Sequence, residues 1–161
     1  MSPMSLRAAV VVASNRAAAR VYADETGPLI ADWLREQGFA CGDPVVVPDG
    51  DPVREAIAAA VADGVRVVLT TGGTGLTPTD RTPEATALLL DREVPGIAEA
   101  IRSAGVAKGV PTAMLSRGLA GISGDSLVIN LPGSRGGVKD GLGVLEPVLR
   151  HAVEQVVGSD H

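Results

Sequence analysis

This chain of 161 residues has very few aromatic side chains: one Trp, one Tyr and one Phe. Hydrophobic residues still make up 45% of it, so a core must be built mainly from aliphatic side chains. The single cysteine, Cys41, excludes an internal disulfide and a metal site of several cysteines. Two histidines, one of them the final residue, leave no histidine-rich zinc cluster.

Long apolar runs and excess positive charge are also missing. No stretch approaches the roughly 20 consecutive apolar residues of a membrane helix, so we expect no spanning segment. The formal net charge of −5 argues against a general binder of nucleic acid or anionic membranes. The length predicts a single domain over residues 1–161, with its core at about 6–157. Because Val10, Val11 and Val12 favour a buried strand over a signal peptide, we expect a cytoplasmic protein.

Four continuous apolar runs are typical of parallel strands buried on both faces: Leu6–Ala13, Val45–Val47, Val65–Thr71 and Ser126–Leu131. Segments with helical spacing lie between and after them. Strands that alternate with helices predict an α/β fold, here a three-layer domain with a mostly parallel sheet flanked by helices. The segment Val106–Ser123 has no clear periodicity and is expected to hold a short extra strand or a hairpin.

Proline positions predict where several helices begin or break. We interpret Asp51 as an N-cap because Pro52 follows it, and Thr82 before Pro83 repeats that pattern. Pro147 interrupts the last helical segment, so we expect a short helix followed by a longer one.

Polar and glycine-rich groups follow each predicted strand, and 20 glycines are present in all. In an open parallel sheet, ligands bind outside the carboxyl ends of the strands. There the sequence places Ser14-Asn15-Arg16, Pro48-Asp49, Thr71-Gly72-Gly73-Thr74-Gly75 and Pro132-Gly133-Ser134. Glycine lets backbone amides approach a ligand closely, so the last two groups predict loops that hold phosphate. The alternative is a pair of tight turns without a ligand.

Neither glycine loop has a known nucleotide signature. No Gly-Lys-Ser/Thr follows, which excludes a P-loop, and the glycine spacing differs from the dinucleotide-binding fingerprint. A serine hydrolase is disfavoured because His151 lies in the final helical segment, far from any nucleophile elbow.

Two aspartates lie where a cation could assist phosphate chemistry. Asp49 follows a strand, and Asp80 follows the first glycine loop. Mg²⁺ is often held by one or two carboxylates together with substrate phosphates, so both are candidate Mg²⁺ ligands. The alternatives are a turn residue for Asp49, and a cap or an ion pair with Arg81 for Asp80. The candidate cations near the same edge are Arg16, Arg81, Arg117, Arg135 and Lys139.

The segment from Thr70 to Pro78, followed by Asp80 and Thr82-Pro83-Glu84-Ala85, strongly resembles the molybdopterin-binding domain of the Mog/MoaB family. That family includes bacterial molybdopterin adenylyltransferases and the G domain of gephyrin. A second segment agrees: Leu115-Ser116-Arg117, then Asn130 to Ser134, then Lys139. The resemblance covers roughly residues 9–156.

The resemblance implies transfer of AMP from Mg-ATP to the terminal phosphate of molybdopterin, with release of pyrophosphate. It implies a homotrimer or hexamer, and hand-over of the product for molybdate insertion. Asp49 and Asp80 match the catalytic, Mg²⁺-linked positions. The ligand-binding positions are Ser14, Thr71, Gly72, Gly73, Thr74, Gly75, Ser116, Arg117, Asn130, Pro132, Gly133, Ser134 and Lys139.

Three departures from the family pattern keep a second hypothesis open. Asn15 replaces a common aspartate, Thr79-Asp80-Arg81 replaces Arg-Asp-Val, and Arg135-Gly136 replaces Pro-Lys. The second hypothesis is a non-catalytic molybdopterin-binding or carrier protein of the MoaB type. The two hypotheses differ in whether ATP is cleaved.

Overall fold

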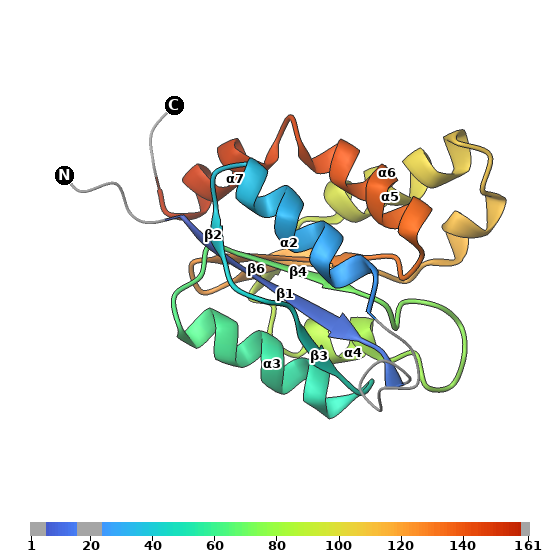
Figure 1. Cartoon of the computed structure of the whole chain (residues 1–161), viewed down its shortest axis with the longest axis horizontal. Helices are drawn as coiled ribbons and strands as arrows, with labels where there is room; N and C mark the ends of the chain where they lie inside the picture. The colour runs from blue at the N-terminus through green and yellow to red at the C-terminus, as the bar shows by residue number, and fades with distance from the viewer. Residues whose placement is uncertain (1–5, 16–23, 159–161) are drawn as a thin grey trace.

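A mostly parallel sheet lies at the centre of the protein, as the sequence predicts (Figure 1). The computed structural model describes residues 6–15 and 24–158. The strand order is β2-β1-β4-β7-β6-β5, with β3 also paired to β1. The strands are β1 (Arg7–Ala13), β2 (Ala40–Cys41), β3 (Val45–Val47), β4 (Val67–Thr71), β5 (Arg92–Glu93), β6 (Ala120–Ser123) and β7 (Ser126–Leu131).

All four predicted strands are present and parallel. β1 pairs in parallel with β2, β3 and β4, and β4 pairs in parallel with β7. Every residue of β4 and β7 is buried, which explains why apolar side chains predominate in both strands. Only β5 and β6 run antiparallel to their neighbours, at the far edge.

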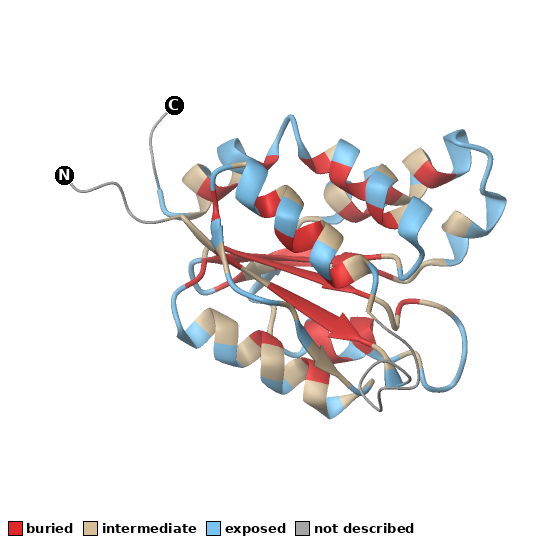
Figure 2. Cartoon of the chain, viewed as in Figure 1, coloured by how far each residue is buried: buried red, intermediate tan, exposed pale blue. Residues whose placement is uncertain are grey.

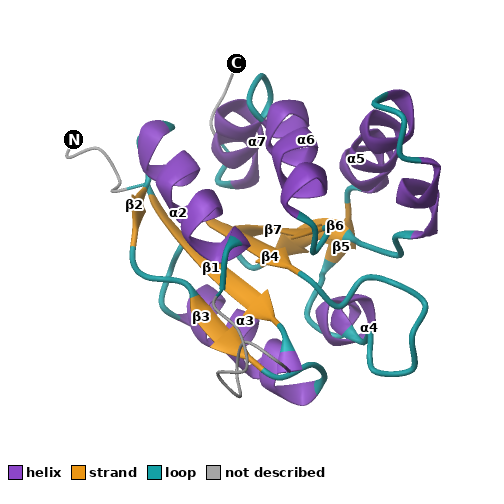
Figure 3. Ribbon diagram, turned by 45° about the vertical axis from the view of Figure 1, so that its right-hand side comes forward, coloured by secondary structure: helices purple, strands orange, loops and turns teal. Residues whose placement is uncertain are grey.

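Helices cover both faces of the sheet, so the three-layer prediction is confirmed (Figure 3). One layer contains α2 (Thr26–Glu36), α5 (Pro95–Ala107), α6 (Arg135–Leu145) and α7 (Leu149–Val156). The other contains α3 (Asp51–Ala62) and α4 (Thr82–Ala87). Each layer packs on its own aliphatic cluster, and the buried residues follow the sheet and the helix faces turned to it (Figure 2). Among the described residues, no helix combines the length and apolar character needed to cross a membrane.

Both predicted side-chain caps are wrong. Helix α3 begins at Asp51 itself and has Gly50 at its N-cap, at φ 95°. The Asp51 carboxylate instead approaches Arg54, at 3.9 Å. Arg81 occupies the N-cap of α4, and Thr82 caps nothing because its buried hydroxyl lies against Gly73 of the glycine loop. A proline fits both the first and the second helical position, so it locates a helix start only to within one residue.

The last helical segment breaks near Pro147, as predicted, but the order of lengths is reversed. Helix α6 has 11 residues and α7 has 8. The Ser134 side chain accepts a hydrogen bond from the Gly137 amide at 3.1 Å, so it caps α6 and starts it earlier than the apolar spacing indicates.

The segment without clear periodicity is mostly irregular. It contains a short 3₁₀ helix, η1 (Pro111–Leu115), and then β6, which turns back through Gly124 onto β7. The expectation of a short extra strand or a hairpin is met by β6, which pairs antiparallel with β7.

Candidate functional site

The carboxyl ends of β1, β3, β4 and β7 meet at one edge of the sheet. The Ser14 amide after β1 donates to the Val47 carbonyl oxygen at 2.9 Å. The two glycine loops touch, since a Cβ added to Gly133 would lie 3.3 Å from the Gly72 α-carbon. Thr71 joins the same loops because its hydroxyl donates to the Pro132 carbonyl oxygen at 2.6 Å.

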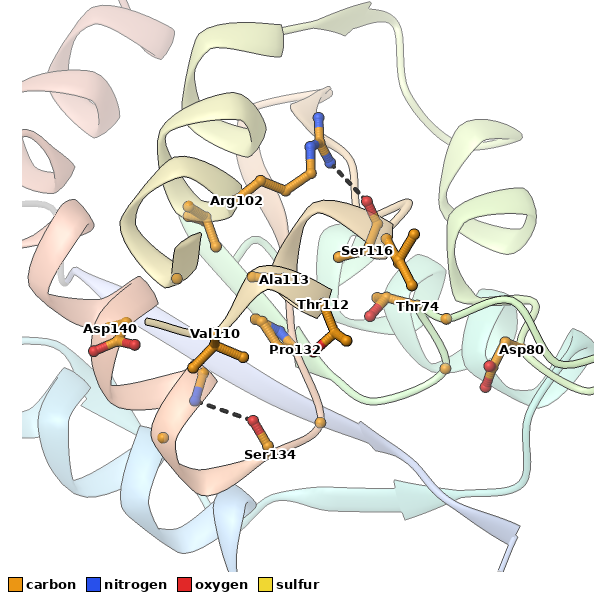
Figure 4. A pocket seen from close by; sticks show the side chains of 18 residues that line it. Thr74, Asp80, Arg102, Val110, Thr112, Ala113, Ser116, Pro132, Ser134 and Asp140 are labelled. Atoms are coloured by element: carbon orange, nitrogen blue, oxygen red, sulfur yellow. Dashed lines mark hydrogen bonds between the residues drawn. The ribbon is translucent and has the colours of Figure 1, made fainter. Parts of the chain in front are cut away.

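A cavity of about 460 Å³ opens on one side of these loops (Figure 4). The loop after β4 contributes Thr74 and Asp80, and the start of α6 contributes Ser134, opposite them in the view. Helix η1 and the end of α5 form the remaining wall, which includes Ile101, Val110 and Leu115. The lining combines apolar walls with a few polar groups, as small-molecule sites do.

A second cavity of about 300 Å³ lies between the glycine loops and the start of α2. Its lining includes Ser14, Thr26, Gly72 and Arg135. Gly133 and Ser134 line both cavities, so the same loop separates and connects them. The arrangement provides two compartments that share a glycine-rich rim.

The first glycine loop depends on backbone conformations that favour glycine. Gly72 has a φ of 90° and Gly73 a φ of 69°. A Cβ at Gly72 would press on the Ala13 carbonyl oxygen, while one at Gly73 would lie 2.6 Å from Asp49 Oδ1. A side chain at either position would therefore meet both strain and a steric clash.

Asp49 and Asp80 lie on either side of this loop. A Cβ at Gly75 would lie 2.7 Å from Asp80 Oδ2, an atom that also accepts the Thr77 amide at 3.1 Å. Burial, and then the negative charge of Asp80, raise the pKa of the Asp49 carboxyl above its usual value. The Asp49 amide donates to Asn15 Oδ1 at 2.9 Å, which fixes the start of the turn.

These carboxylates fit a divalent cation of the Mg²⁺ type. Asp49 Oδ1 is buried and has no hydrogen-bond partner among the described residues. A cation bound at Asp49 would offset both the burial and the neighbouring negative charge that raise the pKa of this carboxyl. Mg²⁺ needs only one or two protein carboxylates when phosphate oxygens and water complete its shell. Asp49 and Asp80 would therefore hold the ion, which supplies charge neutralisation to bound phosphates.

Arg117 holds the loop rather than lining the cavity. Its guanidinium donates to the carbonyl oxygens of Gly75 at 2.9 Å and Asp80 at 2.7 Å, and it pairs with Glu84 at 2.5 Å. Its own amide donates to the Thr74 carbonyl oxygen at 2.8 Å. The hydrogen bond from Arg117 lowers the pKa of the Glu84 carboxyl, which favours the ion pair. These bonds occupy the guanidinium that the resemblance assigns to ligand binding.

Asn130 is also engaged within the protein. It is buried, and its Nδ2 donates to Thr70 Oγ1 at 2.9 Å and Thr86 Oγ1 at 3.1 Å. Its Oδ1 accepts the Leu119 amide at 2.9 Å. The side chain thus links β4, α4 and the start of β6, and these bonds stabilise the fold.

Lys139 is not brought to either cavity. Buried Val138 and Leu142 face the sheet, so helical spacing turns Lys139 outward. There it lines a separate hollow with Asp32 and Trp33 of α2. Of the other candidate cations, Arg135 lines the smaller cavity, and Arg16 lies outside the described residues.

Several cavity residues are not among the sequence candidates. Arg102 lines the larger cavity and donates to the carbonyl oxygens of Ser116 at 3.2 Å and Gly118 at 3.0 Å. Thr112, Ala113 and Asp140 also face it (Figure 4). The segment around η1 has no periodicity that would reveal them. The predicted residues that do line this cavity are Gly73, Thr74, Gly75, Asp80, Ser116, Pro132, Gly133 and Ser134.

Comparison with known proteins gives a consistent result. A family model described as a probable molybdopterin binding domain matches residues 9–151. The molybdenum cofactor biosynthesis bifunctional protein of Synechococcus elongatus is 44% identical over 155 residues, which are 96% of this chain and 48% of that protein. The molybdopterin adenylyltransferase of Haemophilus influenzae is 40% identical over 144 residues, covering 85% of this chain and 71% of that one.

A solved structure agrees over nearly the whole chain. The molybdopterin biosynthesis Mog protein from Mycobacterium ulcerans is 53% identical, with a TM-score of 0.90, covering 93% of this chain and 98% of that one. The mostly parallel sheet has helices on both faces, and two glycine loops touch at the carboxyl ends of its strands. This arrangement is typical of α/β domains that bind small molecules. The chain belongs to the molybdopterin-binding domain family of molybdenum cofactor biosynthesis, which confirms the resemblance seen in its motifs.

Proposed function

We propose that the protein transfers AMP from Mg-ATP to the terminal phosphate of molybdopterin. The observation that supports this most directly is the pair of cavities that meet at Gly133 and Ser134, because a two-substrate transfer needs two compartments with one shared phosphate rim. The adenylyltransferase name of the Haemophilus influenzae relative supports the same reaction. In the reaction, a phosphate oxygen of molybdopterin attacks the α-phosphorus of ATP, and the bond to pyrophosphate breaks.

The chain's own groups suit positioning and charge stabilisation, which dominate phosphoryl-type chemistry. The glycine loops present backbone amides, and the N-terminus of α6, with Gly136 and Gly137, opens onto the larger cavity. A helix N-terminus favours negative charge, so this end of α6 suits a phosphate group. Ser134 accepts a bond from Gly137, and its hydroxyl proton remains able to donate to a ligand.

Asp49 and Asp80 place negative charge beside the glycine loop, where Mg²⁺ on the ATP phosphates would be held. Arg135 lies at the smaller cavity and supplies positive charge toward an anionic ligand. Arg117 fixes the backbone around Asp80, which keeps that carboxylate oriented. None of these groups needs to form a covalent intermediate.

The test is incubation of the purified protein with molybdopterin, Mg²⁺ and ATP labelled in its α-phosphate. We expect one labelled adenylyl-molybdopterin and one pyrophosphate for each ATP consumed. Molybdopterin binding without pyrophosphate release would instead identify a carrier, the second candidate, and would refute the transferase.

We propose further that the chain forms a homotrimer. Two large apolar side chains lie together in a separate hollow at α5 and η1, where Val106 is 39% and Met114 is 60% exposed. Burying these side chains between copies of the chain would stabilise the oligomer, which adds to the stability that a small aliphatic core provides. Light scattering coupled to gel filtration should give three times the monomer mass, and a monomer at micromolar concentration would refute the trimer.

A further inference from the structure

Two buried side-chain oxygens beside Gly73 have no hydrogen-bond partner within residues 6–15 and 24–158: Asp49 Oδ1 and Thr82 Oγ1. Both face the Gly73 α-carbon, because a Cβ added there would lie 2.6 Å from Asp49 Oδ1 and closer still to Thr82 Oγ1. The two oxygens come from different parts of the chain, the turn after β3 and the first residue of α4. They converge on the glycine loop that forms the cavity rim.

Three other buried threonines near the site have bonded hydroxyls, unlike Thr82. Thr86 lies one turn further along α4 and, like Thr82, is 0% exposed, but its hydroxyl accepts Asn130 Nδ2 at 3.1 Å. Thr70 and Thr71 are bonded as well. Buried polar groups nearly always find a partner, since leaving one unpaired destabilises the folded state. The contacts within the protein therefore do not explain why the Thr82 hydroxyl is buried without a partner.

The surrounding backbone holds this hydroxyl at the glycine loop. The Thr82 amide donates to the Gly73 carbonyl oxygen at 3.1 Å, so α4 and the loop are joined directly beside the two oxygens. Gly73 has a φ of 69° and no side chain, so its α-carbon can lie against both oxygens.

We propose that Thr82 is a further residue of the divalent-cation site, its hydroxyl oxygen facing the ion together with the carboxylates of Asp49 and Asp80. The proposal rests on the proposed function, because that function places the cation there. A threonine or serine hydroxyl combined with a carboxylate holds Mg²⁺ in P-loop enzymes, so the donor set is chemically suitable. The unpaired state of both oxygens in the free protein follows, since the ion is the partner that satisfies them.

The experiment measures binding of Mn²⁺ alone, from the loss of its free-ion electron paramagnetic resonance signal, and thermal unfolding without metal. Thr82→Val keeps the shape but removes the hydroxyl, and we expect it to weaken Mn²⁺ binding by about 10-fold. Its melting temperature without metal should stay the same or rise, because a methyl group replaces an unpaired hydroxyl. Thr82→Ser keeps the hydroxyl and should bind Mn²⁺ like the wild type.

Thr86→Val is the matched control, on the same helix and equally buried. It loses the bond from Asn130, so it should melt at a lower temperature and bind Mn²⁺ normally. Wild-type Mn²⁺ affinity in Thr82→Val would overturn the proposal and leave the proposed function intact. So would a fall in its melting temperature equal to that of Thr86→Val, because the hydroxyl would then have a structural partner.

Two separate measurements distinguish a failure of the Thr82 proposal from a failure of the proposed function. A wild-type protein that binds no Mn²⁺ at millimolar concentration overturns the role of Thr82. AMP transfer with Mg-ATP, assayed on the same preparation, then decides whether the transferase itself also fails.

Discussion

The guanidinium of Arg117 donates a hydrogen bond to the backbone carbonyl oxygen of Asp80 at 2.7 Å. A second bond from the same group reaches the Gly75 carbonyl oxygen at 2.9 Å. The Arg117 side chain thus joins the two ends of the segment from Gly75 to Asp80, which carries the Asp80 carboxylate. The position of Asp80 depends on a residue 37 positions away in sequence.

Arg117→Lys should lower AMP transfer while leaving the protein folded. Lysine carries a single ammonium and lacks the planar fork, so it cannot bond both carbonyl oxygens and Glu84 together. Misplacement of Asp80 should reduce kcat roughly 10- to 100-fold. Pyrophosphate release under steady state is the measurement. Glu84→Gln is the control: it removes an exposed ion pair but keeps both carbonyl bonds, so a loss as large as that of Arg117→Lys would contradict this explanation.

Asp80→Asn should keep the fold and molybdopterin binding but reduce AMP transfer by about 100-fold or more. The amide oxygen of asparagine can still accept the Thr77 amide, so only the charge is lost. Mg²⁺-dependent pyrophosphate release, measured beside a thermal melt, distinguishes the two effects. Full activity in this variant would remove Asp80 from the mechanism, and a collapsed melt would show that the residue is structural.

Gly73→Val should abolish binding of both molybdopterin and ATP. The new side chain must adopt φ 69° and enter the space occupied by Asp49 Oδ1 and Thr82 Oγ1. Isothermal titration calorimetry on folded protein measures the loss. Gly143→Ala is the matched control, because no atom lies within 4 Å of a Cβ there and alanine favours a helix by about 0.5–1 kcal/mol. Unchanged affinities in Gly73→Val would mean that the loop is only a turn.

Asn130→Ala should weaken folding and leave ligand affinity intact. The substitution strips partners from the Leu119 amide and from the hydroxyls of Thr70 and Thr86. Leaving such groups unpaired should lower the unfolding free energy by roughly 1–3 kcal/mol. Urea unfolding and ligand titration below the melting temperature separate the two properties. A normal unfolding midpoint with lost affinity would return Asn130 to the ligand site.

Asp49→Asn should stabilise the metal-free protein at neutral pH. Burial and Asp80 raise the pKa of the Asp49 carboxyl in the folded protein above its usual 3.8. The folded state then binds more protons than the unfolded state, so its stability falls as pH rises between the two pKa values. The advantage of asparagine should be absent below the unfolded pKa and complete above the folded pKa.

Thermal melts in EDTA across roughly pH 3 to 8 test this dependence. Adding Mg²⁺ at neutral pH should cancel the advantage, because the ion neutralises the aspartate and has less affinity for the asparagine variant. An advantage that is constant over the whole pH range would show that titration of Asp49 is not its cause.

Much of the fold follows from local sequence patterns. The apolar runs at Val45–Val47 and Ser126–Leu131 predict those strands to the residue. Burial on both faces explains the second run, whereas the first is a partly exposed strand that its three β-branched valines favour. The glycine loops could be assigned to the ligand edge for a similar reason, since parallel strands bring their carboxyl ends together. The motif from Thr70 to Ala85 was sufficient to indicate the family.

The roles of individual side chains within the site depend on tertiary contacts. The sequence alone determined that the glycine loop, Asp49 and Asp80 lie near one another. The loop and Asp49 each follow a strand of the same sheet, and Asp80 follows the loop. The sequence did not determine that Arg117 and Asn130 bond to the protein itself, because their partners lie 11 to 60 positions away. Periodicity specifies which face of an element is buried, but the folded chain decides which polar atoms find partners and which, like Thr82 Oγ1, remain unpaired.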